Sequence, residues 1–294
     1  MGKILVTGAS GHIGELTLKN LLNREIPADQ LAGLVRDPSK AQDLSKMGSD
    51  LHAGDYMDPP SLRRALKDVE KLMLVSTHAF TDRKQAHANV IDAAVKAGVE
   101  HIVFMPIIRK AGSDFSMKEV TEEDIFTEQK IASSGIAYTI VKHPPFLNTM
   151  PSYFGPRVLE TGLRVPLGSG KVASATRENL AEAHGAVLTQ DGHKNKTYTL
   201  TGSQAVSFEE MAEILSRVSG KKVPLTAVTD EEYIESGISN GVPDFVAPFL
   251  LGWVKGILRG EWDQVTGDLE KLIGHKPTTT EEYFRTLYAH GAWK

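Results

Sequence analysis

The sequence predicts a doubly wound α/β fold, in which helices cover both faces of a parallel sheet. Two observations lead to this prediction. Short strands that are apolar throughout alternate with helices along the first half of the chain, and such strands are buried on both faces. The first strand also runs through a glycine-rich turn into a helix, the arrangement that places ligands at the carboxyl ends of the strands.

The glycine turn follows an apolar strand at residues 3–6. It reads Thr7-Gly8-Ala9-Ser10-Gly11-His12-Ile13-Gly14, and apolar residues then recur at helical spacing as far as Leu22. Gly8 allows a tight turn, Gly11 lets the backbone approach a pyrophosphate, and Gly14 lets the helix pack on the strand. The helix N-terminus offers N–H groups to phosphates. The turn therefore predicts a dinucleotide site, although its G-x-x-G-x-x-G spacing differs from the commoner G-x-G-x-x-G and an ordinary strand–helix turn is the alternative.

The other elements of the sheet follow in order along the chain. Further strands are expected at 30–36, 51–54, 71–76, 100–105 and 136–141. Helices are expected between them, including one at 85–97 and one that starts with Thr121 as its N-cap and runs to Ser133. These strands and helices make residues 1–150 a dinucleotide-binding unit.

Beyond Pro144 the regular alternation of strands and helices loosens. Helices are expected at 178–188, at 207–218 and over most of the chain after 230, with short strands at 196–200 and 223–228. We expect residues 151–294 to form a smaller α-rich unit, partly interleaved with the first and packed over the ligand edge of the sheet.

The composition limits the possible functions. The chain has 294 residues, a net charge of -4 and no cysteine, which excludes disulfides and cysteine-ligated metal and gives no basic surface for nucleic acid. We expect no metal site, no signal peptide and a cytoplasmic protein, either monomer or homodimer. The longest apolar stretch, 245–258, is interrupted by Pro248 and Gly252, so we expect a pair of core helices and no membrane span.

Several stretches along the chain carry a family resemblance. They are the glycine turn, Gly54-Asp55-Tyr56, residues 89–103, and the C-terminal stretches 192–198, 219–223 and 268–274. With these the chain resembles the atypical short-chain dehydrogenase/reductases, and among them the NmrA-like group that includes triphenylmethane reductases and NAD(P)H:quinone oxidoreductases. The resemblance covers nearly the whole chain and implies a Rossmann-like sheet that binds NAD(P)H.

The residue after the second strand decides between the two dinucleotides. An acidic residue there binds the ribose hydroxyl of NAD, whereas an arginine accommodates the 2′-phosphate of NADP. Arg36 occupies this position, and a guanidinium can bind a phosphate through two charge-assisted hydrogen bonds. We therefore expect NADP, with NAD possible if Asp37 is the ribose ligand and Arg36 is a solvated side chain.

Further cofactor contacts are expected at the strand ends and in the glycine turn. In the turn and after the third and fourth strands they are Thr7, Ser10, His12, Ile13, Asp55, Ser76 and Thr77. The resemblance adds Lys142, Pro144 and Phe146, where similar proteins bring backbone close to the nicotinamide.

The proton-transfer residues of many short-chain dehydrogenases are missing. Those enzymes use a serine with a Tyr-x-x-x-Lys pair on one helix, where the lysine lowers the tyrosine pKa. Only Tyr138 has a lysine four residues later, Lys142. Both fall in the sixth strand, where four residues span about 13 Å against about 6 Å along a helix. A conjugated acceptor does not need this machinery, because it already provides the electron sink.

Three other side chains are candidate proton donors. His78 and His143 follow the fourth and sixth strands, where a histidine can donate near neutral pH or simply line a loop. Asp124 lies near the position of the lysine that isoflavone-reductase relatives carry, so the lysine mechanism of those relatives is not carried over, and the favoured interpretation is a helix-start charge stabilised by the helix dipole. The expected substrate pocket is apolar and aromatic, and consists of Phe80, Met105, Pro106, Ile107, Tyr153 and Phe154.

These features favour an NADPH-dependent reductase of a quinone-like or conjugated aromatic small molecule. One alternative is a redox sensor of the NmrA type, which binds the dinucleotide without turnover. Another is a reductase of a lignan-type benzylic ether.

Overall fold

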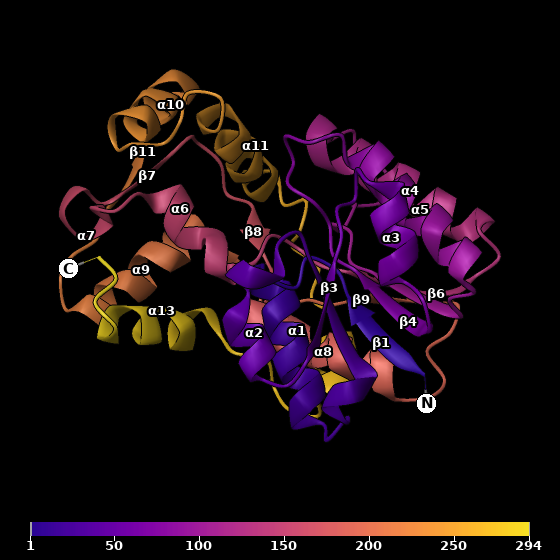
Figure 1. Cartoon of the computed structure of the whole chain (residues 1–294). Helices are drawn as coiled ribbons and strands as arrows, with labels where there is room; N and C mark the ends of the chain where they lie inside the picture. The colour runs from indigo at the N-terminus through magenta and orange to yellow at the C-terminus, as the bar shows by residue number, and fades with distance from the viewer. Residues whose placement is uncertain (1, 294) are drawn as a thin grey trace.

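The computed structural model describes residues 2–293, arranged around one parallel sheet (Figure 1). Its seven strands follow the order β3-β2-β1-β4-β5-β6-β9, and all neighbours are parallel. Their bounds are β1 Lys3–Val6, β2 Leu31–Val35, β3 Asp50–Ala53, β4 Val69–Leu74, β5 His101–Phe104, β6 Ala137–Lys142 and β9 Lys196–Thr199. The predicted doubly wound Rossmann-like sheet is confirmed.

Helices cover both faces of the sheet, as the continuous apolar strands require. One face packs against α3 (Pro59–Ala65), α4 (Arg83–Ala97) and α5 (Glu123–Ser133), and the other against α1 (His12–Asn23) and α8 (Arg177–Thr189). The short α2 (Gln42–Lys46) precedes β3. The N-cap predicted at Thr121 is wrong: a π-helical turn occupies Lys118–Glu122 and α5 begins at Glu123.

One strand and one helix from the second half of the chain belong to the sheet and its helical cover. The strand β9 pairs with β6, with Lys196 opposite Thr139 and Thr199 opposite Lys142. The helix α8 lies on α1, where Thr17 Oγ1 is 3.2 Å from His184 Nδ1. The other helices and strands of the second half form a smaller region beside this sheet.

That region is a helical layer with two small sheets. Its apolar core also includes Ile107, Ile108, Met117 and Val120 from the stretch after β5. Its helices are α6 Met150–Phe154, α7 Val158–Thr161, α9 Phe208–Ser219, α10 Asp230–Ser239, α11 Ala247–Leu258, α12 Asp268–Ile273 and α13 Thr280–Ala289. Its strands pair as β7 (Leu163–Val165) with β11 (Leu225–Ala227) and β8 (Lys171–Val172) with β10 (Val206–Ser207). In Figure 1, α6, α10 and α11 lie beyond the carboxyl ends of the sheet strands.

The longest apolar stretch forms one helix, α11, and not the predicted pair. Pro248 lies in its first turn, where proline is tolerated because the N–H is not needed. Gly256 lies against the Trp262 ring, where a Cβ atom would meet it at 2.4 Å. Within residues 2–293, no helix combines the length and apolar character needed to cross a bilayer.

Candidate dinucleotide site

The glycine turn joins β1 to α1 in the geometry that a phosphate site requires. Gly8 has φ +56°, a conformation that favours glycine. At Gly14 a Cβ atom would lie 2.4 Å from the Gly8 carbonyl oxygen, so only glycine lets the helix pack this closely. At Gly11 an added Cβ atom would meet only the Gly8 oxygen, at 3.2 Å. The space beyond Gly11 is therefore free of protein atoms.

The N-terminus of α1 is open for an anion. Gly11 is its N-cap, and within residues 2–293 no side-chain hydrogen bond caps this helix start. Ser10, Gly11 and His12 are exposed. These N–H groups and the positive end of the helix dipole suit a pyrophosphate.

Two other residues of the turn point into the protein. The Thr7 hydroxyl donates to Met73 O at 3.1 Å and accepts from Val75 N at 2.8 Å. Ile13 packs into the core between the sheet and α8. Both residues fix the turn against its neighbours, so any contribution they make to cofactor binding is through their backbone.

Arg36 follows β2 and is exposed. No ion pair links its guanidinium to another residue in the described part of the chain. The neighbouring Asp37 is already engaged: its Oδ1 accepts from Ser39 N at 3.0 Å and from Ser39 Oγ at 2.6 Å, where it caps a short 3-10 helix. The two side chains thus differ, since the arginine points to solvent and the aspartate caps a turn.

The loops after β3 and β4 are tied together beside the glycine turn. The Tyr56 hydroxyl donates to Val75 O at 2.8 Å, and Asn89 Nδ2 donates to Tyr56 O at 2.9 Å. Asp55 Oδ1 accepts from Met57 N at 2.8 Å. Ser76 Oγ is inaccessible and has no hydrogen-bond partner within residues 2–293. A buried hydroxyl without a partner is rare in proteins, and at this strand end it fits a bound polar ligand.

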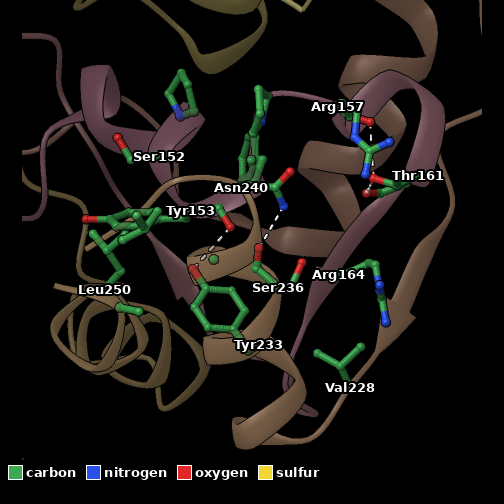
Figure 2. A pocket seen from close by; sticks show the side chains of 18 of the residues that line it. Ser152, Tyr153, Arg157, Thr161, Arg164, Val228, Tyr233, Ser236, Asn240 and Leu250 are labelled. Carbon is green, nitrogen blue, oxygen red and sulfur yellow. Dashed lines mark hydrogen bonds between the residues drawn. The ribbon is translucent and has the colours of Figure 1, made fainter. Parts of the chain in front are cut away.

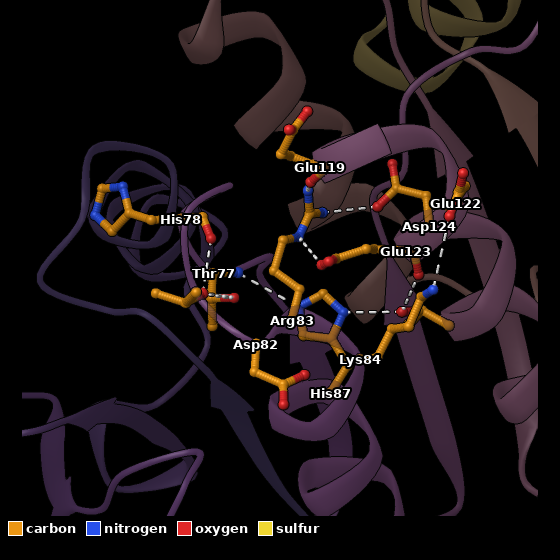
Figure 3. A network of polar contacts seen from close by, with 12 residues as sticks. Thr77, His78, Asp82, Arg83, Lys84, His87, Glu119, Glu122, Glu123 and Asp124 are labelled. Atoms are coloured by element: carbon orange, nitrogen blue, oxygen red, sulfur yellow. Dashed lines mark hydrogen bonds and ion pairs between the residues drawn. The ribbon is translucent and has the colours of Figure 1, made fainter. Parts of the chain in front are cut away.

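A buried ion pair connects the loops after β4 and β5 (Figure 3). Asp124, which is 1% exposed, accepts from Arg83 Nη2 at 2.7 Å through Oδ1 and from Ile107 N at 2.9 Å through Oδ2. Arg83 Nη1 donates to Glu119 O at 3.1 Å. Burial raises the pKa of Asp124 to about 6, although Arg83 and the Ile107 N–H oppose the shift. Asp124 therefore joins α5 to the start of α4 and to the loop after β5.

His87, on α4, fixes the loop after β4 through its ring nitrogens. Its Nε2 accepts from Thr77 N at 3.3 Å, and its Nδ1 is 2.9 Å from Thr127 Oγ1. Burial lowers the pKa of His87 to about 3, so the ring is neutral. The Thr77 N–H is therefore occupied by the protein. His78, the next residue, is exposed and points away from this network in Figure 3.

His143 and Phe146 form a stack after β6. The two rings lie 4.6 Å apart with an interplanar angle of 13°, and the Arg177 guanidinium carbon lies 5.0 Å from the Phe146 centroid. His143 Nδ1 is 2.7 Å from Pro144 O. Burial lowers the pKa of His143 to about 4, although hydrogen bonds to the backbone of Pro144 and Met105 oppose the shift. The imidazole is neutral at physiological pH and packed between loops.

Lys142 ends β6 and pairs with Glu128 at 3.2 Å, as Arg109 does at 2.6 Å. Tyr138 lies four residues earlier on the same strand, where this separation spans about 13 Å. The pair is therefore too far apart to act as a tyrosine–lysine couple.

The expected substrate residues do not form one surface. Met105, Pro106 and Ile107 are buried. Phe80 is 49% exposed and packs edge-on against Phe245 and Phe249, each with a centroid distance of 5.1 Å. Because Phe249 lies in the first turn of α11 and Phe245 just precedes that helix, this contact joins the loop after β4 to the C-terminal region.

Tyr153 and Phe154 lie apart from the other expected substrate residues. They line a cavity of about 700 Å³ among α6, α7, α10, α11 and the β7–β11 pair (Figure 2). Met105, Pro106, Ile107 and Phe80 do not line it. The residues expected to form one pocket are thus divided between the strand edge and this cavity.

Arg83 and His87 organise this site, and sequence reasoning did not identify either residue. Both lie on α4, whose start was expected two residues later, at Gln85. Asp82 is the N-cap of α4 and accepts from Gln85 N at 3.1 Å, so an aspartate three residues before the expected start was the available signal. No local pattern indicates that either side chain is buried.

The comparisons with known proteins agree with this geometry. Residues 8–191 match the family described as NAD(P)H-binding. The chain is 35% identical to quinone oxidoreductase 2 of Escherichia coli (strain K12), over 97% of this chain and 98% of that protein. It is 34% identical to an NAD(P)H azoreductase of Xenophilus azovorans, over 83% of each chain.

Among solved structures, the fold matches Citrobacter sp. triphenylmethane reductase in complex with NADP(H). The TM-score is 0.88 at 34% identity, and the match covers 97% of this chain and 99% of that one. Together with the open helix N-terminus after β1, these matches show that the chain belongs to the NAD(P)H-binding family, among its NmrA-like oxidoreductases.

Proposed function

We propose that the protein is an NADPH-dependent reductase that delivers hydride to a quinone-like or otherwise conjugated aromatic small molecule. The observation that carries the proposal is the full-length similarity to a quinone oxidoreductase and a triphenylmethane reductase, combined with a phosphate turn of the required geometry. NADPH supplies the hydride when bound.

The chain's own residues have four tasks in this reaction. The N–H groups at the start of α1 bind the pyrophosphate, and Arg36 binds the 2′-phosphate, since Asp37 is engaged as a cap. Ser76 Oγ, which lacks a protein partner, bonds to the bound dinucleotide. The loops fastened by Asp124 and His87 hold the acceptor side of the site in one geometry, which matters because hydride transfer depends on close alignment.

The reaction does not require a protein proton donor. The neutral His143 ring and the Asp124 carboxylate are both enclosed and bonded to backbone, while His78 is exposed to solvent. A conjugated acceptor takes the electron pair of the hydride into its own π system, and water supplies the proton that follows. We expect His78→Ala to change kcat by less than about twofold, because a solvated imidazole adds little to water as a donor.

The test follows NADPH absorbance with a panel of acceptors: a benzoquinone, a naphthoquinone, a cationic triphenylmethane dye and an azo dye. Turnover that depends on the acceptor supports the reductase. The Tyr138→Phe variant serves as a control, and it should retain full activity because the tyrosine–lysine couple is not assembled.

The same preparation distinguishes a redox sensor from a reductase. Calorimetric titrations with NADPH and NADP⁺ give the affinity for each form. Tight binding of both forms with no turnover of any acceptor would refute the reductase and favour a sensing role.

A further inference from the structure

The cavity of about 700 Å³ in the C-terminal region is separate from the strand edge that carries the dinucleotide site. Its walls come from α6, α10, α11 and the β7–β11 pair, and its size is that of small-molecule pockets in general. None of the glycine-turn residues, Arg36 or Ser76 lines it. The dinucleotide site therefore does not account for this cavity.

Two guanidinium groups stand at one side of this cavity. Figure 2 shows Arg157 and Arg164 on that side, and both residues are exposed. In the range 2–293 neither has a carboxylate within ion-pair distance. The cavity lining includes one acidic residue, Glu232, whose Oε2 accepts from Thr229 N at 2.8 Å in the capping box of α10. Glu232 leaves one negative charge in the lining, against the two positive charges of Arg157 and Arg164, and it is paired with neither arginine.

The opposite side of the cavity is aromatic and fixed in place. Tyr233 donates from its hydroxyl to Tyr153 O at 3.1 Å, which joins α10 to α6. The Tyr153 hydroxyl itself lies 3.2 Å from Thr149 Oγ1. The polar ends of both tyrosines are therefore engaged with protein. These tyrosines are 5% and 8% exposed, and their rings line the cavity together with the half-buried Trp293. Rings of this kind pack against other aromatic groups.

We propose that this cavity is a second ligand site, which binds a small aromatic anion such as an arene carboxylate or sulfonate. The anionic group pairs with Arg157 and Arg164 at the opening, and the ring packs against Tyr153, Tyr233 and Trp293. Arginine suits this role because its planar group can bind carboxylate or sulfonate oxygens through two hydrogen bonds. The site does not depend on which molecule accepts the hydride.

The test is fluorescence titration of the full-length protein with anilinonaphthalenesulfonate, in the presence of saturating NADPH so that the dinucleotide site is filled. The uncharged analogue N-phenylnaphthylamine is titrated in parallel. We expect the Arg157→Gln/Arg164→Gln double variant to raise the Kd of the sulfonate by about tenfold or more, and to leave the Kd of the uncharged analogue within about twofold.

Two further variants complete the experiment. Arg63→Gln removes an exposed arginine on α3 and should change neither Kd. Ser236→Trp places a large ring in the cavity lining and should abolish binding of both probes while NADPH affinity is retained. An unchanged sulfonate Kd in the double variant, or loss of the wild-type probe signal when NADPH is added, would overturn the proposal. Because turnover is measured separately, failure here leaves the reductase proposal unaffected.

Discussion

The two ends of the carboxyl edge of the sheet are built in opposite ways. After β1 and β2 the edge is open: Ser10, Gly11 and Arg36 are exposed, and no side chain caps α1. After β5 and β6 it is closed, and Asp124 and His143 are buried and bonded to neighbouring loops. At the open end the N–H donors are free to bind a ligand. At the closed end the polar side chains are hydrogen-bonded to the protein backbone.

This difference assigns separate roles to polar residues that look alike in the sequence. A charged or hydroxylated residue after a parallel strand is a reasonable candidate for catalysis. At the closed end, however, burial makes each such group a fastening point, since an unpaired buried charge is costly. Hydride transfer to a conjugated acceptor is compatible with this arrangement, because the reaction requires a rigid closed end and no acid–base chemistry from its side chains.

The largest predicted effect comes from removing the buried ion pair at the closed end. Arg83→Met leaves the Asp124 carboxylate buried without its cation, and we expect the free energy of unfolding at neutral pH to fall by about 3–5 kcal/mol. Urea unfolding measures it. The control is Lys84→Met, which removes a neighbouring exposed contact to Glu122 and should cost less than about 1 kcal/mol. Equal losses in the two variants would contradict the fastening role of Arg83.

The pH dependence of the unfolding free energy is a second test of the burial of Asp124. Folding raises the pKa of Asp124 from 3.8 to about 6, so the folded state holds this proton more tightly than the unfolded state. Stability that the protonated carboxyl confers is fully present below about pH 4 and is lost as the pH rises to about 6.

The matched comparison is with Asp124→Asn, which cannot titrate at this position. Relative to that variant, the wild type should lose about 2–3 kcal/mol of unfolding free energy between pH 4 and pH 6. Urea unfolding of both proteins at several pH values measures the difference. Parallel stability curves would show that Asp124 does not carry the shifted pKa.

The contrast also explains which features could be predicted from sequence. The glycine turn was predictable because its three glycines, strand and helix are contiguous, and each residue type reports a local requirement. Asp124 was placed correctly near a helix start, but its partner Arg83 lies 41 positions away. Nothing local shows that this pair is buried. Likewise 196–200 was recognised as a strand, but its pairing with β6 depends on long-range packing.

At the open end, Gly11→Ala should separate cofactor binding from folding. The backbone at Gly11 has φ -89° and ψ 160°, which alanine adopts readily, but its methyl group would lie where we place the pyrophosphate. We expect the Kd for NADPH to rise by about one to two orders of magnitude, with a stability change below about 1 kcal/mol. Calorimetric titration and urea unfolding measure the two quantities.

The contrasting variant in the same turn is Gly14→Ala. Its Cβ atom would lie 2.4 Å from the Gly8 oxygen, so it should destabilise the fold itself. If Gly11→Ala binds NADPH normally, the phosphate site is not at this helix N-terminus.

The smallest predicted effect concerns the choice between the two dinucleotides. Arg36→Gln removes the guanidinium that we assign to the 2′-phosphate, and kcat/KM with NADPH should fall by about tenfold. NADH lacks that phosphate, so its kcat/KM should stay within about twofold, and the ratio of the two values isolates the contact from any general damage. Arg63→Gln removes an exposed arginine in the last turn of α3 and should leave the ratio unchanged. If Arg36→Gln lowers both values equally, Arg36 supports the turn after β2 and does not read the phosphate.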